Sequence, residues 1–418
     1  MLAYYFPPLG MGGVQRTAKF VKYLPLFGWE PVVVTVKDTA YFAKDHSLAE
    51  EVAQARVERT ESLDPQRLLF LARRGLHRHP TKGEGVAGTA WKRYEALLRW
   101  LFVPDAKILW VPFGLVRAWR LHRRERIRVV MTTSPPPSAH LAGLLLRQFA
   151  GCRWVADFRD QWTGGHLDLS PTPLHRAVNK WLERIVLHHA DAVVCVSHAL
   201  AASLKSKSRR RDFASVVIPN GYDEEDFGPS PPRAKRGKLL VYCGSVGRLA
   251  HPGNYLKACA ALIQKRRLNT SALRVVFVGT AIGVDLQGLV SQLGLERYVE
   301  VTGYLEHRAA VRWLQAADVL VLLLTGTTSQ DVVPGKVFEY LRARKPILAV
   351  APPGETVDLL EESAPHVVIC QDTPEAIEQG LDELLYGASK VTEGSRAGLE
   401  RFERRHLAAR LAEVLNSV

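Results

Sequence analysis

A lysine and a glutamate stand three residues apart in a short stretch that could bind a phosphate group. Lys336 and Glu339 follow Pro334 and Gly335, and a polar loop precedes them at 325–330. Proline suits the first turn of a helix, because its missing N–H costs nothing there, and the N–H groups and positive dipole end of a helix start attract anions. We therefore predict that Lys336 contacts a phosphate and that Glu339 holds the cis-diol of a ribose. An exposed helix start with an i,i+3 ion pair explains the same spacing equally well.

The segment around this stretch alternates strands and helices, which indicates a doubly wound sheet. Residues 319–324 are a continuous apolar run, typical of a parallel strand buried on both faces. Further strands, each followed by a helix, are expected at 238–243, 273–278, 299–302 and 347–350. Ligands bind beyond the carboxyl ends of the strands in such sheets. We therefore expect the loops there to converge on one nucleotide, through Gly244, Ser245, Arg248, Gly303 and Tyr304.

The N-terminus repeats this organisation around a glycine-rich loop. An apolar piece at 2–6 is followed by this loop, a helical pattern and a strand at 31–36. Gly12 and Gly13 would let the backbone approach a ligand at the carboxyl end of the first strand. The third glycine of the G-x-G-x-x-G motif is missing, so the pattern does not predict a dinucleotide site. Because the first strand looks short, we expect it to begin before Met1.

An Arg–Asp pair follows another predicted strand of the N-terminal half. Residues 154–158 form this strand, and Arg159 and Asp160 come directly after it, where ligands bind in such sheets. We predict that both side chains take part in the chemistry, and an ion pair tying two loops together is the alternative interpretation. His140 lies inside a helix start and is expected to be structural. Residues 38–128 are expected to be mostly helical.

A change of composition divides the chain. Residues 228–237 are rich in proline, glycine and charge, which is typical of a linker. We predict a Rossmann-like domain at 1–227, this linker, a second Rossmann-like domain at 238–395, and a terminal helix in 396–418 that can cross back to the first domain. The predicted fold class is therefore α/β, with two doubly wound domains facing each other across a cleft.

The composition indicates a soluble protein in a reducing compartment. Of the 418 residues, 47% are apolar and 23% charged, as in globular proteins, and no apolar run is long enough to span a membrane. The start shows no signal peptide. The five cysteines are scattered without a C-x-x-C pair, so we expect them to be reduced. We predict a cytoplasmic protein.

The net charge of +14 is concentrated in one segment. Residues 67–128 hold 15 basic and 4 acidic residues, and four tryptophans lie among leucines there: Trp91, Trp100, Trp110 and Trp119. Basic residues interleaved with tryptophan and leucine suggest a surface attracted to anionic lipid. We therefore predict peripheral association with the inner face of the cell membrane. Nucleic acid is the less favoured partner, and a merely solvated basic face is as good an explanation as either.

Taken together, the motifs resemble the retaining glycosyltransferases of family 4, which have the two-Rossmann fold called GT-B, over nearly the whole chain. The residues that carry the resemblance are Tyr5-Phe6-Pro7-Pro8 with Gly12-Gly13, Thr132-Thr133-Ser134-Pro135-Pro136, Asp157-Phe158-Arg159-Asp160 with Trp162, Ile218-Pro219-Asn220-Gly221, Gly244-Ser245, and Pro334-Gly335-Lys336-Val337-Phe338-Glu339-Tyr340-Leu341 with Lys345-Pro346. The resemblance implies a nucleotide-sugar donor in the C-terminal domain. It also implies a lipid-linked or polysaccharide acceptor at the N-terminal domain, in bacterial cell-envelope glycan synthesis.

Two departures from the family pattern concern the transferred sugar. The family's two glutamates, separated by seven residues, appear here as Asp331 and Glu339. Glu339 matches the second and by resemblance binds the ribose, whereas Asp331 replaces the first and leaves open which sugar hydroxyl is held there. Many members also carry a catalytic-loop histidine, whose place near Ser134 is not histidine here. We expect Arg159 and Asp160 to supply that polar contact.

The chemistry implied by the resemblance needs positive charge at the donor. When the bond from the sugar C1 to the diphosphate breaks, the leaving group gains negative charge. Arg248, Lys336 and the loop N–H groups at 12–13 and 334–335 would stabilise this charge. The departing phosphate oxygen can take the proton of the acceptor hydroxyl, so no dedicated base is needed. No D-x-D sequence occurs in the chain, and we therefore expect no cofactor and no obligatory metal.

Three functions remain compatible with the sequence. The first is transfer of a hexose or related sugar to a lipid-linked or polysaccharide acceptor. The second is a sugar-nucleotide epimerase of the same architecture, which would need carboxylates and a histidine around the sugar C2. The third is a non-catalytic nucleotide-binding scaffold. The sequence identifies neither the sugar, the base, the linkage nor the oligomeric state.

Overall fold

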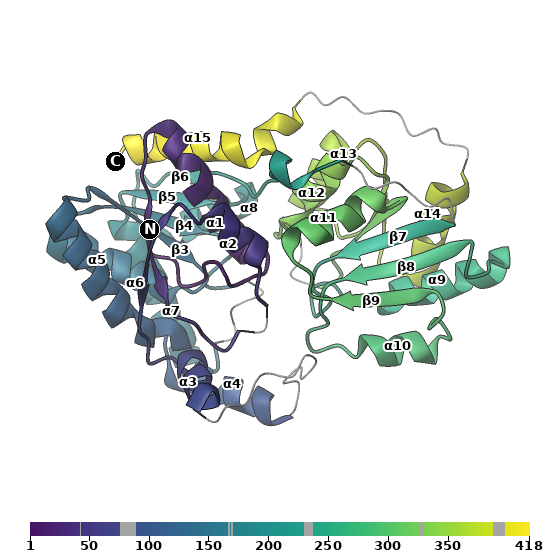
Figure 1. Ribbon diagram of the computed structural model, residues 1–418, viewed down its shortest axis with the longest axis horizontal. Helices are drawn as coiled ribbons and strands as arrows, with labels where there is room; N and C mark the ends of the chain where they lie inside the picture. The colour runs from purple at the N-terminus through teal and green to yellow at the C-terminus, as the bar shows by residue number, and fades with distance from the viewer. Residues whose placement is uncertain are drawn as a thin grey trace. The chain divides into compact units, whose positions relative to one another are not determined.

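A computed structural model describes residues 1–41, 43–75, 89–165, 168, 170–229, 237–326, 330–387 and 398–418. The chain forms two compact units (Figure 1). Unit 1 comprises Met1–Pro219 and Leu407–Val418, and unit 2 comprises Asn220–His406. The division falls before the segment 228–237 in which the sequence places a linker. Most of that segment, and the boundary expected at 395–396, lie outside the described residues.

Unit 2 contains a six-stranded parallel sheet in the order β12-β11-β10-β7-β8-β9. Its strands are β7 (Lys238–Cys243), β8 (Leu273–Val278), β9 (Val299–Gly303), β10 (Val319–Leu323), β11 (Ile347–Val350) and β12 (Val367–Cys370). Numbered from β7 as the first strand, this is the order 3-2-1-4-5-6 of the Rossmann fold. The doubly wound sheet predicted for this half is therefore confirmed.

Three helices cover each face of this sheet. One face packs on α9 (Gly253–Arg266), α10 (Leu286–Gln292) and α14 (Pro374–Tyr386). The other packs on α11 (His307–Ala316), α12 (Lys336–Ala343) and α13 (Glu355–Ser363). Side chains along a strand alternate between these cores, so Leu240 and Tyr242 contact the first and Val241 the second. Burial on both faces explains why β10 is an uninterrupted apolar run.

The strand order of unit 2 reverses between β7 and β10, which pair side by side. From β7 the chain proceeds to β8 and β9 on one side, and from β10 it proceeds to β11 and β12 on the other. In open α/β sheets this switch point is where ligands bind, beyond the carboxyl ends of the strands. The loops that leave β7 and β10 therefore define the candidate site of unit 2.

Unit 1 also contains parallel strands. A four-stranded sheet has the order β3-β4-β5-β6, and a second pair joins β1 and β2. The strands are β1 (Val32–Val36), β2 (Arg56–Thr60), β3 (Val129–Ser134), β4 (Arg153–Phe158), β5 (Ala192–Cys195) and β6 (Ser215–Val217). Leu2 forms parallel bridges to both Val34 and Thr132, so the N-terminus lies between the two sets.

One expectation for unit 1 is wrong, and another is incomplete. The apolar piece at 2–6 forms only the bridge at Leu2 instead of a full strand. Where it is described, the segment 38–128 is mostly helical, as expected, but it also contains the strand β2 (Arg56–Thr60), which pairs with β1. This strand reads Arg-Val-Glu-Arg-Thr, so three of its five residues are charged, and Arg56 and Arg59 are exposed. Its pairing with β1 is a tertiary contact that the pattern of a polar segment does not reveal.

The helices of unit 1 surround these strands (Figure 1). They are α1 (Gly12–Tyr23), α2 (His46–Glu51), α3 (Pro65–Gly75), α4 (Thr89–Leu101), α5 (Val111–Glu125), α6 (Ser138–Ala150), α7 (Pro173–His189) and α8 (His198–Lys207), with short turns η1 (Leu24–Phe27) and η2 (Ala106–Trp110). The terminal helix expected in 396–418 divides into η4 (Leu399–Phe402) and α15 (Arg404–Asn416). In unit 1, Leu407, Leu411 and Leu415 pack on Met131 and Val155.

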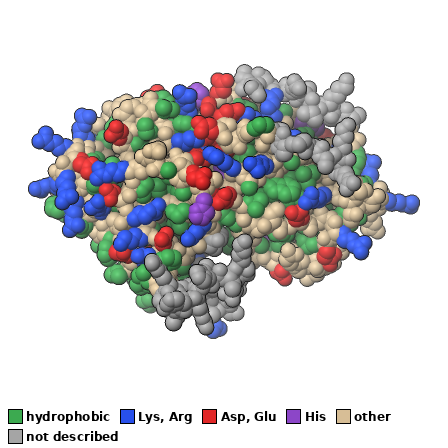
Figure 2. Space-filling model, viewed as in Figure 1, with side chains coloured by type: hydrophobic (Ala, Val, Ile, Leu, Met, Phe, Trp, Pro, Cys, Tyr) green, Lys and Arg blue, Asp and Glu red, His purple; other side chains and the backbone are tan. Residues whose placement is uncertain are grey.

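The basic segment 67–128 does not present its tryptophans on one face. Trp110 is fully buried in the core of unit 1, and its indole N–H donates to Thr60 Oγ1 at 2.9 Å. Trp100 and Trp119 are exposed on α4 and α5, and the side chain of Trp91 is outside the described residues. Figure 2 shows Lys and Arg side chains gathered over the end of unit 1 where α5 lies. No helix within the described ranges is long and apolar enough to cross a bilayer.

Candidate active site

Lys336 points at the loop that leaves β7. It is the first residue of α12, and its Nζ donates to the hydroxyl of Tyr242 at 2.9 Å and lies 4.1 Å from the centre of that ring. The Tyr242 hydroxyl in turn donates to the carbonyl oxygen of Ser245 at 2.8 Å. An ammonium group above an aromatic ring is stabilised without losing its charge. The ammonium is therefore held at the switch point beside the start of a helix, as an anion site requires.

Gly244 is a glycine because Lys336 occupies the space beside it. Its backbone φ is +125°, a conformation that other residues rarely adopt, and a Cβ there would lie 2.8 Å from Lys336 Nζ. The N–H of Gly244 donates to Val278 at the end of β8. The backbone of Gly279 approaches that of Gly244 closely, since a Cβ on Gly279 would lie 2.2 Å from the Gly244 oxygen. These glycines bring the loops after β7 and β8 together.

The side chain of Tyr340 bridges β7 and β10 at the same edge of the sheet. The two strands pair only as far as Val241 and Leu320. Beyond that point the Tyr340 hydroxyl accepts a hydrogen bond from the Cys243 N–H at 2.8 Å and donates to the Val321 oxygen at 3.1 Å. Burial raises the pKa of this hydroxyl well above its ordinary value. One side chain from α12 thus satisfies both backbone groups where the ladder stops.

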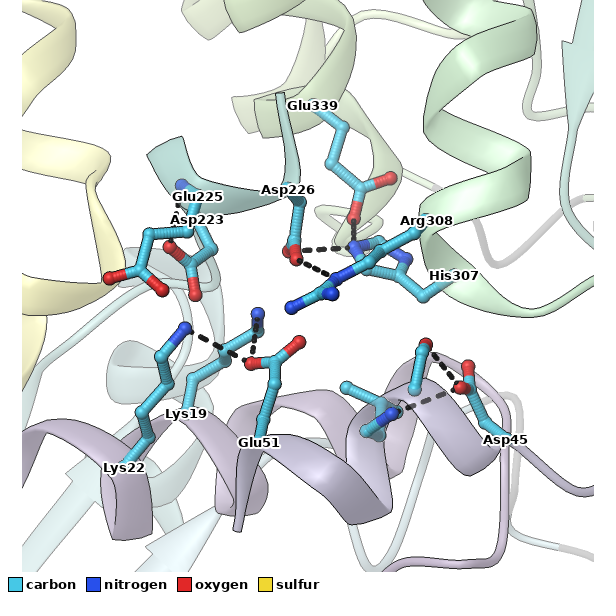
Figure 3. Close-up of polar contacts among 12 residues, drawn as sticks. Lys19, Lys22, Asp45, Glu51, Asp223, Glu225, Asp226, His307, Arg308 and Glu339 are labelled. Carbon is cyan, nitrogen blue, oxygen red and sulfur yellow. Dashed lines mark hydrogen bonds and ion pairs between the residues drawn. The ribbon is translucent and has the colours of Figure 1, made fainter. Parts of the chain in front are cut away.

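Glu339 is buried one turn further along α12, close to a histidine from α11 (Figure 3). Glu339 Oε1 lies 3.7 Å from His307 Nε2, which lies 3.1 Å from Asp226 Oδ2. Asp226 closes the short turn η3 (Glu224–Asp226). The side chain of Arg308 approaches the other oxygen of Asp226 at 3.9 Å and is 46% exposed. Two carboxylates therefore share one imidazole.

The other residues predicted for unit 2 lie on loops of the same edge. Gly303 ends β9 and forms a bridge with Gly279, which places Tyr304 beside the loops after β7 and β8. Arg248 is exposed, and its backbone adjoins Gly326 in the loop after β10. Asp331 is exposed in a turn. Pro334 precedes α12, which begins at Lys336, and Gly335 caps it. These contacts bring together the loops after β7, β9 and β10, which the sequence predicts to converge, and they add the loop after β8. That these loops bind one nucleotide stays a prediction.

In unit 1, Gly12 and Gly13 are the first residues of α1 and not part of a loop. The helix begins without a side-chain cap, and both glycines are exposed. Arg159 lies beside them, since a Cβ on Gly13 would be 3.1 Å from its Nη1. Its Nε and Nη2 donate to the carbonyl oxygens of Ser134 and Pro135 at 3.1 and 2.6 Å. Most of the guanidinium therefore fastens the loop after β3.

One nitrogen of Arg159 remains directed at the start of α1. Its Nη1 is buried, and no hydrogen-bond partner for it is found within the parts of the chain that the structure describes. Burial also lowers the pKa of this guanidinium. Asp160, the next residue, is half-buried, and burial raises the pKa of its carboxyl group to about 6. The pair thus lies at the carboxyl end of β4, where the sequence places it.

Two buried ion networks of unit 1 have no counterpart in the sequence predictions. Arg16, fully buried, donates from Nη2 to Asp157 Oδ1 at 2.9 Å and from Nη1 to the Pro219 oxygen at 2.9 Å. Lys107 donates to Asp64 at 3.1 Å, and the Tyr4 hydroxyl donates to the same carboxylate at 2.7 Å. These groups occupy the carboxyl edge beneath α1 and beside η2. They stabilise the edge and leave fewer charges for a ligand.

His140 is structural, as predicted. It is buried in α6, with Nδ1 2.7 Å from Thr132 Oγ1, and burial lowers its pKa to about 3. The five cysteines are free thiols, and all but Cys243 are buried. The residues missed in unit 2 are Tyr242, Tyr340, His307 and Asp226. A tyrosine within an apolar strand signals a buried hydroxyl that needs a partner, but nothing in the sequence links the last two to Glu339.

Comparison with known proteins identifies the family. Residues 11–226 match Glycosyltransferase Family 4, and residues 237–386 match Glycosyl transferases group 1. A D-inositol 3-phosphate glycosyltransferase from Kineococcus radiotolerans is 29% identical over 168 residues, 37% of this chain and 38% of that protein. The probable glycosyltransferase WbjE from Pseudomonas aeruginosa is 25% identical over 277 residues, 63% of this chain and 67% of that protein. The alignment to the first relative thus spans well under half of its length.

A solved structure of HepE from Anabaena, in complex with UDP, has the same fold. It matches with a TM-score of 0.62 at 14% identity, covering 100% of this chain and 99% of that one. The shared architecture of two Rossmann-like domains is the GT-B fold. The first family match covers more than half of the 418 residues. The chain therefore belongs to glycosyltransferase family 4.

Proposed function

We propose that this glycosyltransferase moves a sugar from a nucleoside diphosphate sugar to a lipid-linked or polysaccharide acceptor, with retention of the anomeric configuration. The observation that carries the proposal is the ammonium of Lys336, held beside Gly244 at the start of α12 and at the switch point of the unit 2 sheet. An anion bound there would meet a positive charge, helix N–H groups and a glycine that leaves room. HepE, which shares this fold, was solved with UDP.

The proposed reaction breaks the bond between the sugar C1 and the diphosphate oxygen. The electron pair leaves with the diphosphate, and the sugar ring gains oxocarbenium character. Lys336 stabilises the growing negative charge, with Arg248 contributing less because it is exposed. The acceptor oxygen bonds to C1 on the face that the diphosphate leaves, and its proton passes to the departing phosphate oxygen. The configuration at C1 is then retained without a dedicated base.

Incubation of the purified protein with a panel of sugar nucleotides and an acceptor lipid extract tests this function. We expect one nucleotide sugar to be consumed, with release of nucleoside diphosphate and formation of a glycolipid or glycan whose linkage keeps the donor's anomeric configuration, as read by NMR. Conversion of the sugar nucleotide to its C2 epimer would establish the epimerase instead. Binding of nucleotide without any turnover would favour a scaffold.

We further propose that no metal ion is obligatory, because Lys336 and Arg248 would offset the charge of the diphosphate and the sequence has no D-x-D motif. Activity should survive excess EDTA at an unchanged rate. A loss of activity in EDTA that Mg²⁺ or Mn²⁺ restores would contradict this part of the proposal.

The lipid-linked acceptor fits an exposed apolar face of unit 1. We call it the docking surface; it is formed by α4 and α7 and comprises Leu97, Trp100, Leu101, Leu174 and Trp181. The two helices are neighbours here, since His175 Nε2 lies 3.0 Å from the Trp100 oxygen. Exposed cations flank the surface: Arg93, Arg99, Arg176, Lys180 and Arg184. Apolar side chains ringed by cations suit an anionic membrane surface.

Sedimentation with vesicles tests this surface. The protein should bind vesicles that contain phosphatidylglycerol more than neutral vesicles, and raised salt should release much of it, since each basic residue contributes only about 1 kcal/mol at the membrane. Trp100→Ser should weaken binding, whereas Trp119→Ser, an exposed tryptophan on α5, should not. Equal binding to both vesicle types, or preferential binding of nucleic acid, would refute the membrane assignment.

A further inference from the structure

We propose that His307 is a positioning residue that holds Glu339 in the orientation needed to bind the ribose hydroxyls of the donor nucleotide. The inference rests on the proposed function, in which a nucleotide sugar occupies the switch point of unit 2. It adds one residue each from α11 and η3 to that site. Glu339 belongs to α12, whereas His307 is the first residue of α11 and Asp226 belongs to η3.

Both carboxylates approach the same nitrogen of His307 (Figure 3). His307 Nε2 lies 3.1 Å from Asp226 Oδ2, within hydrogen-bond distance, and 3.7 Å from Glu339 Oε1, an ion-pair distance. All three side chains are buried: His307 and Glu339 are 8% exposed, and Asp226 is 6% exposed. Asp226 therefore fixes the imidazole, and the imidazole lies against one oxygen of the Glu339 carboxylate.

A carboxylate that binds a diol needs such support. A glutamate side chain loses rotamer freedom when it is fixed, so one held in advance binds its ligand better than a mobile one. A buried carboxylate also needs a charge or hydrogen-bond partner to offset the loss of water. The imidazole of His307, fixed by Asp226, lies against the Glu339 carboxylate and limits its movement.

The alternative is that His307 only stabilises the fold. In that case its loss would weaken binding of every nucleotide alike, or lower the melting temperature without affecting recognition of the ribose. A positioning role predicts a narrower defect: the protein should lose its ability to distinguish a ribose from a ribose without hydroxyls. These two outcomes can be separated with nucleotide analogues.

The experiment compares the affinities of UDP and GDP with those of their 2′,3′-dideoxy analogues by titration calorimetry. In the unmodified protein, we expect removal of the hydroxyls to weaken binding of the preferred nucleotide roughly tenfold or more. Glu339→Ala should abolish this difference. His307→Ala should reduce it to about threefold or less, and Asp226→Ala should reduce it part of the way, because the imidazole then loses its anchor.

A matched control is His406→Ala, which removes an exposed histidine 3.2 Å from the carboxylate of Glu403 in the same unit. It should leave the difference unchanged. If His307→Ala destabilises the protein, His307→Gln, which retains a neutral donor, should fold and still lose part of the discrimination.

The possible failures are distinguishable. If Glu339→Ala loses the discrimination but His307→Ala and His307→Gln keep it in full, the positioning role is wrong and the proposed function stands. If the unmodified protein binds neither nucleotide, or Glu339→Ala keeps the full discrimination, the proposed site is wrong and this inference fails with it.

Discussion

Unit 1 and unit 2 both end their parallel strands in loops that carry charged residues, but they hold these charges differently. In unit 1, Arg16 is fully buried against Asp157, and Arg159 donates to two loop carbonyl oxygens. In unit 2, Lys336 contacts the hydroxyl of Tyr242 and the face of its ring. Apart from Arg159 Nη1, the cationic groups named at the first edge bind a carboxylate or carbonyl oxygens, whereas the second edge holds a cation against a glycine loop.

Charge at the carboxyl end of a strand therefore does not by itself make a ligand site. A buried ion pair has its charge already neutralised, and removing one partner leaves an unpaired charge in a dry environment. A cation on an aromatic ring keeps its charge for a ligand. Removing a cation from the edge of unit 1 should therefore lower stability, whereas removing Lys336 from the edge of unit 2 should lower turnover.

The largest effect is expected for Arg16→Met in unit 1. The change leaves Asp157 buried without its partner, which should lower the free energy of unfolding by about 3–5 kcal/mol. Differential scanning calorimetry should show a marked fall in the transition of unit 1. The double variant Arg16→Met with Asp157→Leu should recover much of the loss, and a double variant as unstable as the single one would contradict a charge-based cause.

Lys336→Ala in unit 2 should show the opposite pattern. Turnover should fall about 10²–10³-fold, because the ammonium acts on charge that grows in the transition state, whereas the melting temperature should change little. Steady-state kinetics and calorimetry measure the two effects. Lys257→Ala, an exposed lysine on α9, is the control and should leave both unchanged. Full activity of Lys336→Ala would remove the basis for the active-site assignment.

Tyr340→Phe tests whether the switch point of unit 2 depends on one hydroxyl. The variant leaves the Cys243 N–H and the Val321 carbonyl oxygen without this partner, which should lower the free energy of unfolding by about 1–3 kcal/mol. Chemical denaturation monitors the change. Tyr298→Phe, whose hydroxyl donates to a single carbonyl oxygen at Leu268, should cost less, and an equal or greater cost would argue against the bridging role.

The smallest effect concerns Asp160 and depends on pH. Burial raises its pKa to about 6, so the folded chain binds more protons than the unfolded chain between about pH 4 and 6, and stability falls as the pH rises through this range. Solvent reaches part of the side chain, and we expect a loss of about 1–2 kcal/mol. Asp160→Asn should therefore melt higher than the unmodified protein at pH 7.5 and at the same temperature at pH 4.

The control for this pH dependence is Asp358→Asn, an exposed aspartate on α13, which should not change melting at either pH. If Asp160→Asn is less stable than the unmodified protein at pH 7.5, the ionised carboxylate stabilises unit 1, and its role would resemble that of Asp157.

The sequence alone determined the fold class, because doubly wound sheets bury their central strands on both faces and so produce continuous apolar runs such as 319–324. It also located the two edges, since glycines and prolines mark where strands end. Lys336 and Glu339 lie on one short helix, so their spacing along the chain was enough to place them together.

Only the tertiary structure decided which charged side chains are available to a ligand. Arg16 and Asp157 are 141 residues apart along the chain, and Asp226 and His307 are 81 apart, so no local pattern could reveal either pair. The polar strand β2 and the buried Trp110 were mispredicted for the same reason. Whether a polar segment pairs with a strand, or a tryptophan lies in a core, depends on what the rest of the chain packs against it.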